Sequence, residues 1–287
     1  MRTVILILLL VAVCWFAADC AQAADLQVPQ NAVAGQPLTI NLEGSGTLYL
    51  IGPGQIIKRE FKSGPVEIKG EELHSAGRWI AVVKGSSEQS QVFWVKPGKP
   101  EKLNFLARPS RVPVAKKDVI SGVAFVFDQY QNMVLTPTPV NFKLLVGGTG
   151  AAKTVTSRAG VAWTDSSSAA KAGSAQFVAS AGDASVLRVV QQVAADPCER
   201  NLRMHVAGRS GDMITVETDP IRDCSGNPVP DGTIVTFIQT DKTGKSTVDA
   251  RIKKDIARAE LPASDNATIT VAAGVVLGNE LHVGGKQ

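Results

Sequence analysis

The sequence predicts an all-β protein built as a series of sandwiches. Aromatic residues make up only 5% of the 287-residue chain, which contains 26 glycines and 15 prolines. This composition favours many short strands joined by frequent turns. The chain is too long for one ordinary sandwich and suits two or three. Stretches in which apolar and polar residues alternate, such as Gln36–Leu42, are predicted strands, and so is the apolar run Thr47–Ile51.

The first 23 residues have the pattern of a secretory signal peptide. A basic start at Arg2 is followed by an apolar stretch from Val4 to Val13 and by the small residues of Ala21-Gln22-Ala23. A membrane anchor is the alternative. The apolar run breaks at Asp19, however, before the ~20 residues that a bilayer-spanning helix needs. We therefore expect no integral membrane span after signal cleavage.

A lipidated cysteine is a second alternative for this segment. A lipoprotein site resembles Leu-Ala-Gly-Cys, but Val13 precedes Cys14 and Asp19 precedes Cys20. The prediction is an exported mature chain that begins near Ala24, in the periplasm, at the outer surface or in the medium.

The mature chain divides into three predicted modules. Residues 24–97 form the first, assigned from strand pattern alone, with a turn at Gly52-Pro53-Gly54 and a last strand at Gln91–Val95. Lys96-Pro97-Gly98-Lys99-Pro100 has the composition of an exposed linker. Residues 98–194 and 195–287 form the second and third modules. Almost no linker separates these two, so we expect a stiff connection between them.

One loop of the third module organises the prediction. It runs from Asp223 to the strand that contains Phe237. Asp223 is placed to close an Asx-type turn, and Gly226 tolerates a positive φ. Asn227 precedes Pro228 and is therefore directed towards extended geometry. After this loop, residues 233–237 alternate as in a half-buried strand.

A weaker copy of the loop lies 95 residues upstream. Five residues keep the same offset in both copies. Asp128, Asn132, Val134, Val140 and Phe142 correspond to Asp223, Asn227, Val229, Val235 and Phe237. Five matches in one register indicate a duplicated unit of about one small domain.

These residues resemble the invasin/intimin-type bacterial immunoglobulin-like family, group 1. Its hallmark is a strand ending in Asp, a Gly-Asn-Pro-Val turn and an alternating strand ending in Phe. The resemblance is good across residues 201–283 and partial across 102–190, where Gln131 replaces the glycine and Met133 the proline. It implies tandem immunoglobulin-like β-sandwiches, three modules in all, after a cleaved signal peptide. It also implies a spacer or adhesive stalk on a bacterial surface, with no catalytic residues.

Two cysteines remain in the mature chain, Cys198 and Cys224. In an oxidising compartment a disulfide is the expected state. Predicted strands at Arg200–Val206 and Met213–Thr218 would bring both cysteines to one pole of the module. Closing a loop of about 26 residues would contribute about 3.5 kcal/mol in the chain-entropy treatment. A redox or metal pair is the alternative.

Enzymatic and nucleic-acid functions are not indicated. The three histidines, His74, His205 and His282, lack zinc-binding spacing, and the Gly-x-Ser-x-Gly motif is absent. The stretch Gly147–Gly150 suits a hairpin turn better than a phosphate site. A net charge of +4 with scattered basic residues gives no nucleic-acid footprint. No cofactor or metal is expected.

Two weaker alternatives concern ligands. Asp128 and Asp223 could help to hold calcium at module junctions, although an Asp that opens a turn is already explained by its backbone bonds. Trp79, Trp94 and Trp163 are candidate ligand-facing aromatics, for example for sugar stacking, although tryptophans in strands more often pack in a core.

The sequence therefore predicts an exported, non-enzymatic protein that acts as a spacer or adhesive module. Its partner would be an unidentified protein or glycan at the cell envelope. The rival prediction is an accessory binding protein that recognises a polysaccharide or a secreted partner.

Overall fold

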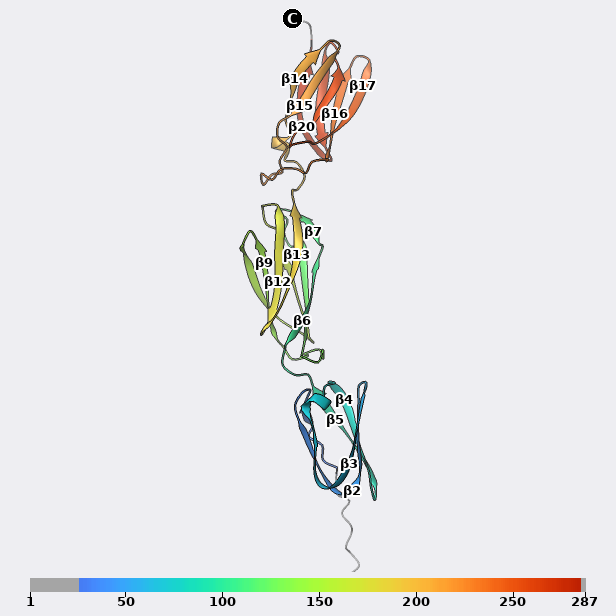
Figure 1. The fold of residues 1–287 in the computed structure, drawn as a ribbon. Coiled ribbons are helices and arrows are strands. Elements are labelled where there is room, and N and C mark those ends of the chain that lie inside the picture. Colours follow the sequence, from blue (N-terminus) through green and yellow to red (C-terminus); the bar gives the residue numbers. More distant parts are fainter. Residues whose placement is uncertain (1–25, 285–287) are drawn as a thin grey trace, which may run out of the picture. The chain divides into compact units, whose positions relative to one another are not determined.

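The computed structural model describes residues 26–284, whose regular secondary structure is almost entirely β-strand (Figure 1). The predicted signal peptide, residues 1–23, lies outside the described residues. The chain forms two compact units. The first comprises Met1–Pro100 with Phe127–Val134, and the second comprises Glu101–Val126 with Leu135–Gln287. Within the described residues, no helix has the length and apolar character needed to cross a membrane.

The first unit contains one five-stranded sheet in the order β1-β5-β4-β2-β3. Strand β1 pairs with β5 in parallel, and the other neighbours are antiparallel. A 3₁₀ turn, η1 (Gly70–Glu72), precedes β4. The strands are β1 (Asn31–Val33), β2 (Leu38–Gly52), β3 (Gln55–Ile68), β4 (Gly77–Lys84) and β5 (Glu88–Lys96).

The β2–β3 hairpin contains the two longest strands of this unit. Its register shifts between Leu42 and Ser45. The first half of β2 buries residues such as Ile40 and the second half buries residues such as Leu50, all in one core. The two strands that the sequence predicts on either side of this point are therefore halves of one strand, because a bulge bends the hairpin without ending it.

Trp79 anchors the core of the first unit. Its side chain is fully buried, and its ring centroid lies 6.1 Å from that of Phe93. The indole Nε1–H donates to the backbone oxygen of Ser75 at 2.9 Å. In immunoglobulin-like domains a Tyr hydroxyl makes this kind of bond to the backbone upstream. Trp79 has no hydroxyl, but its indole N–H makes a comparable bond to the backbone upstream.

The second unit contains two pairs of sheets. The first pair joins a five-stranded sheet, β10-β9-β12-β13-β7, and a three-stranded sheet, β11-β8-β6. Its strands are β6 (Lys102–Arg108), β7 (Arg111–Pro113), β8 (Ile120–Phe127), β9 (Pro139–Val146), β10 (Thr149–Thr156), β11 (Val161–Ser166), β12 (Gly173–Ala181) and β13 (Ala184–Val193). Phe105, Phe142 and Phe177 are buried together, with ring centroids 5.1–6.1 Å apart.

The second pair of sheets joins a three-stranded sheet, β14-β15-β18, and a four-stranded sheet, β17-β16-β19-β20. Its core includes Val216, Val235, Phe237 and Ile269. The strands are β14 (Met204–Ser210), β15 (Met213–Thr218), β16 (Ile234–Asp241), β17 (Gly244–Arg251), β18 (Arg258–Pro262), β19 (Ala267–Ala273) and β20 (Val276–Val283).

The start of β14 corrects one prediction. The strand begins at Met204 and not at Arg200, because residues Glu199–Asn201 form a 3₁₀ turn, η2. His205 therefore lies near the beginning of the strand, opposite Glu217 at the end of β15. In the predicted strand Arg200–Val206, His205 would lie near the far end, and that placement is wrong.

Candidate functional site

The loop after β15 is built around the carboxylate of Asp223, which is fully buried. Oδ1 accepts backbone N–H groups from Ser225 and Asn227, both at 2.9 Å, and Oδ2 accepts the N–H of Ala195 at 3.0 Å. The side-chain amide of Asn227 adds bonds to both oxygens, at 3.2 and 3.0 Å. The bond to Ser225 is the Asx turn that the sequence predicts.

These donors determine the charge state of Asp223. Burial alone would raise the pKa of this carboxyl above its usual value. The hydrogen bonds from Asn227, Ala195 and Ser225 outweigh burial and hold the pKa below 3.8. Asp223 is therefore an ionised carboxylate at neutral pH, neutralised by N–H groups.

Asn227 connects this loop to a distant segment of the same unit. Its Nδ2–H donates to the backbone oxygen of Ala170 at 2.7 Å, and its Oδ1 accepts the N–H of Ala172 at 2.8 Å. One carboxamide thus pairs with the C=O and N–H of two residues, as a neighbouring strand would. Asn227 is itself buried, with 8% of its surface exposed.

The loop Phe127–Val134 of the first unit makes the same set of bonds. Asp128 Oδ1 accepts the N–H groups of Tyr130 and Asn132 at 2.9 and 2.8 Å, and Oδ2 accepts the N–H of Gly98 at 2.9 Å. The amide of Asn132 donates to Asp128 Oδ2 at 2.8 Å. Asp128, like Asp223, is buried.

The carboxamide of Asn132 also reaches a backbone segment of the first unit. Its Nδ2–H donates to the backbone oxygen of His74 at 2.8 Å, and its Oδ1 accepts the N–H of Ala76 at 2.9 Å. The two partners are again two residues apart. The Tyr130 ring adds an apolar contact, because it covers Gly35 so closely that a Cβ there would lie 2.6 Å from it. The two loops therefore share one bonding arrangement, which we call the Asp–Asn joint. It consists of Asp128 and Asn132 in the first unit and of Asp223 and Asn227 in the second.

The residues that differ between the two joints still take the same conformation. Gln131 has φ +69° and Gly226 has φ +86°, both in the left-handed region. Met133 forms an isolated bridge with Phe127, as Pro228 does with Arg222. The departures from the sequence motif at Gln131 and Met133 thus leave the loop geometry unchanged.

The remaining motif residues pack in the cores. Val134 and Val229 are buried after each loop, and Phe142 and Phe237 are buried in the strands that follow. These four buried residues attach the loops to the cores of the sheets.

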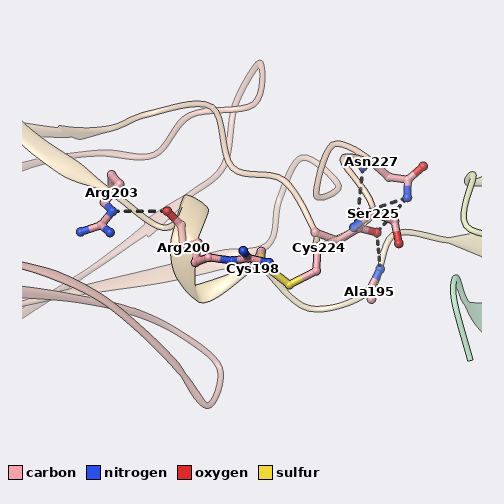
Figure 2. The surroundings of a disulfide bond; sticks show 8 residues. Ala195, Cys198, Arg200, Arg203, Cys224, Ser225 and Asn227 are labelled. Atoms are coloured by element: carbon pink, nitrogen blue, oxygen red, sulfur yellow. Dashed lines mark hydrogen bonds between the residues drawn. A yellow bond between two sulfur atoms is a disulfide. The ribbon is translucent and has the colours of Figure 1, made fainter.

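A disulfide closes the base of the Asp223 loop (Figure 2). Cys198 and Cys224 are bonded, with their Cα atoms 4.6 Å apart and a sequence separation of 26. The backbone N–H of Cys198 also donates to the oxygen of Arg222 at 2.9 Å. The predicted disulfide is therefore confirmed, and it joins the segment that enters the β14–β15 sheet to the loop that carries Asp223.

The contacts of the two aspartates bear on the calcium alternative. Both oxygens of Asp223 accept N–H groups, which a cation would have to displace. Within residues 26–284, no group of three or more metal-ligating side chains is present. The geometry of the Asp–Asn joint therefore supports a structural role for these carboxylates.

The structure separates the three candidate aromatics. Trp79 is fully buried in the core of the first unit, so it does not face a ligand. Trp94 on β5 and Trp163 on β11 are 55% and 57% exposed. Period-two patterning locates such residues on a strand, but it does not tell which face of the sheet is covered.

One serine and one histidine lie close together. Ser75 Oγ is 3.2 Å from His74 Nδ1, and the His74 ring centroid is 6.1 Å from that of Tyr130. A nucleophile and base of this kind need a third group that orients the imidazole, and His74 has no carboxylate partner among the described residues. His205 and His282 are exposed and lie beside Asp219 and Glu280, at 3.3 and 3.7 Å.

Sequence reasoning missed half of each joint. The partners of the two asparagines are backbone atoms of residues 74–76 and 170–172, and the partners of the aspartates include the N–H groups of Gly98 and Ala195. Backbone atoms leave no residue-type signal. The one available clue was position, because Gly98 and Ala195 fall at the predicted module boundaries.

No family model and no curated protein sequence matches the chain. Solved structures of three bacterial immunoglobulin-like proteins of the invasin/intimin type are similar. FdeC, an adhesin of Escherichia coli, is 12% identical over 90% of this chain and 95% of its own, with a TM-score of 0.62. Invasin, a bacterial integrin-binding protein, is 13% identical over 87% of this chain and 56% of its own, with a TM-score of 0.51.

The third similar structure is InvD of Yersinia pseudotuberculosis. It is 13% identical over 89% of this chain and 96% of its own, with a TM-score of 0.50. At these identities the likeness defines the fold. The prediction of all-β, tandem immunoglobulin-like sandwiches is confirmed, and the predicted resemblance to the invasin/intimin type is borne out at the level of the fold.

Proposed function

We propose that this chain is an exported, non-enzymatic protein that serves as a spacer or adhesive module at the cell envelope. It consists of three sandwich modules, residues 24–97, 98–194 and 195–287, after a cleaved signal peptide. The repeated Asp–Asn joint carries this proposal. The side chains of the joint connect backbone segments that are distant in sequence, and the buried carboxylate has a structural role and not a catalytic one.

The joint inside the second unit supports a stiff connection between the second and third modules. Asp223 holds the segment between the modules through Ala195, and Asn227 holds the preceding module through Ala170 and Ala172. A module that is hydrogen-bonded to its neighbour through a loop, in addition to the covalent connection, has less freedom to rotate, because rotation would break these hydrogen bonds. Such a connection suits a protein that projects or bears load.

Similarity to an adhesin and to an integrin-binding protein favours the adhesive version of this role. Cell fractionation tests the proposal. The mature chain is expected in the periplasm, in the outer membrane fraction or in the medium. Retention in the cytoplasm would refute the export part. Substrate turnover that disappears on Ser75→Ala or His74→Ala would refute the non-enzymatic part.

The stiffness has its own test. Spin labels at exposed positions Gln176 and Lys245 would report the distance between the two modules. A narrow distance distribution is expected, and Asn227→Ala should broaden it. An equally broad distribution in both proteins would remove the mechanical part of the proposal.

A second candidate function is supported by the exposure of Trp94 and Trp163. Aromatic faces open to solvent can stack on sugar rings, so an accessory protein that recognises polysaccharide remains a candidate. A glycan array probed with the mature chain discriminates the two. Saturable binding that Trp163→Ala abolishes would favour this second function.

A further inference from the structure

The outer face of the five-stranded sheet carries an unusual set of apolar side chains. Val92, Ile80, Ile51 and Ile56 lie directly opposite one another on β5, β4, β2 and β3. We call these four residues the aliphatic row. Three of them are exposed, at 39%, 41% and 69% for Val92, Ile51 and Ile56, and Ile80 is half-buried.

Further apolar residues flank the row on the same face. Trp94, at 55% exposure, follows Val92 on β5, and the half-buried Tyr49 and Val82 are paired on the other side. Single exposed hydrophobic residues need no explanation, but a contiguous apolar patch with an aromatic residue usually marks a binding surface. The core does not require it, because the opposite face of the same strands already fills the interior with Leu50, Ile57 and Phe93.

The charges around the patch indicate what kind of partner it fits. Lys58 is paired with Glu60 at 2.9 Å, and Lys84 stands opposite Glu88 in the strand register. Glu60 is therefore ion-paired with a lysine, and Glu88 has a lysine as its cross-strand neighbour.

Arg78 and Lys96 are different. Arg78 is the cross-strand partner of Trp94, Lys96 follows Trp94 on β5, and both are exposed. Neither makes an ion pair within the described part of the chain. The border of the patch beside Trp94 is thus positively charged.

We propose that this face docks a partner protein that presents aliphatic or aromatic side chains beside carboxylates. The row and Trp94 would bury apolar area, and Arg78 and Lys96 would meet the acidic groups. A second copy of this chain fits less well, because the glutamates of this face already have lysine neighbours. The proposal gives the adhesive function a partner chemistry and therefore rests on that function.

A selection from random peptides displayed on phage tests the partner chemistry directly, with the mature chain as bait. Recovered peptides should combine apolar residues with Asp or Glu. A synthetic consensus peptide should bind the double variant Ile51→Thr, Ile56→Thr at least ten-fold more weakly. Thr keeps the β-branched shape that suits a strand, but it is smaller than Ile and carries a hydroxyl, so less apolar area is buried on binding. Arg78→Gln should weaken binding several-fold and reduce its salt dependence.

The matched control is Ile234→Thr, which makes the same change at a 48% exposed isoleucine of β16 in the second unit and should leave binding unchanged. Peptides without acidic residues, or peptides that bind the double variant equally well, would overturn the proposal. A dimer that dissociates on Ile51→Thr, or glycan binding lost on Trp94→Thr, would overturn it in favour of those occupants. Cytoplasmic retention would refute the proposed function while leaving the peptide result intact.

Discussion

The Asp–Asn joint predicts a large effect from one buried asparagine. Asn227→Ala removes the acceptor for the Ala172 N–H, the donor to the Ala170 oxygen and the donor to the Asp223 carboxylate. Two neutral bonds at about 1 kcal/mol each and one bond to a charge at about 2 kcal/mol give about 4 kcal/mol as an upper value. Because Ala170 is exposed and Ala172 is half-buried, water will replace some of this stabilisation. We expect a loss of roughly 2–3 kcal/mol.

Two measurements check this value. Urea unfolding followed by far-UV circular dichroism gives the free energy of unfolding, and hydrogen exchange reports the amide of Ala172 individually. That amide should exchange much faster in the variant, while core amides such as that of Phe237 should lose protection only in proportion to the global change. Asn104→Ala, at an exposed asparagine of β6, is the control and should change stability by less than about 0.5 kcal/mol.

Asn227→Asp sharpens the test because it changes charge without changing size. It removes the same donors and places a second carboxylate within about 3 Å of Asp223. Repulsion between the two raises the folded-state pKa of one carboxyl. A raised carboxyl pKa means that the folded state binds protons more tightly, so stability increases as pH falls. Asn227→Asp should be less stable than Asn227→Ala at neutral pH and should recover in acid. If the wild type and Asn227→Ala were equally stable, the Asp–Asn joint would make no contribution to stability and the reasoning would be refuted.

Three further predictions follow from single positions. Asp223→Asn should lower the free energy of unfolding by about 2 kcal/mol at neutral pH, because the new side-chain NH₂ group would face the N–H donors that now bind the carboxylate. Because the pKa of Asp223 is lowered in the folded state, the wild type should be more stable than the variant above pH 3.8, and this difference in stability should shrink as the pH falls below that value. A stability difference that does not change in acid would contradict this. Gly52→Ala should lower stability by about 1–3 kcal/mol, since its Cβ would lie 2.2 Å from the Trp79 ring, whereas Gly208→Ala, which meets nothing within 4 Å, should cost little by the same urea assay. Gln131→Gly should raise stability by roughly 0.5–1 kcal/mol by removing a left-handed non-glycine residue, and a decrease would show that the Gln131 side chain is needed.

Much of the fold was predictable because it depends on side-chain type. The alternation of Val235 and Phe237 sets a strand, and the types and spacing of Asp223, Gly226 and Asn227 set a loop. What failed depends on geometry between elements. The sequence gives no sign that the bulge near Ser45 joins two predicted strands into one, or that η2 delays the start of β14.

The sequence also did not predict which face of each sheet is buried. Trp79 and Trp94 occupy similar strand patterns, yet one is fully buried and the other is 55% exposed. Periodicity separates the two faces of a strand but does not say which face another layer covers. The aliphatic row was unreadable for a related reason, because its members come from four strands whose register is fixed only in the folded sheet.

The joint also explains why its two polar positions are not interchangeable. Every group that contacts the carboxylate of Asp223 is an N–H donor, so an acceptor on both oxygens is needed there and Asp is the residue that supplies it. Asn227 faces one C=O and one N–H, which requires one donor and one acceptor on the same short side chain. Asp128 and Asn132 meet the same demands. Thus the identities of the two polar residues in Asp-x-x-x-Asn follow from the polarity of the groups that they bind, and this argues for a structural origin of the repeat.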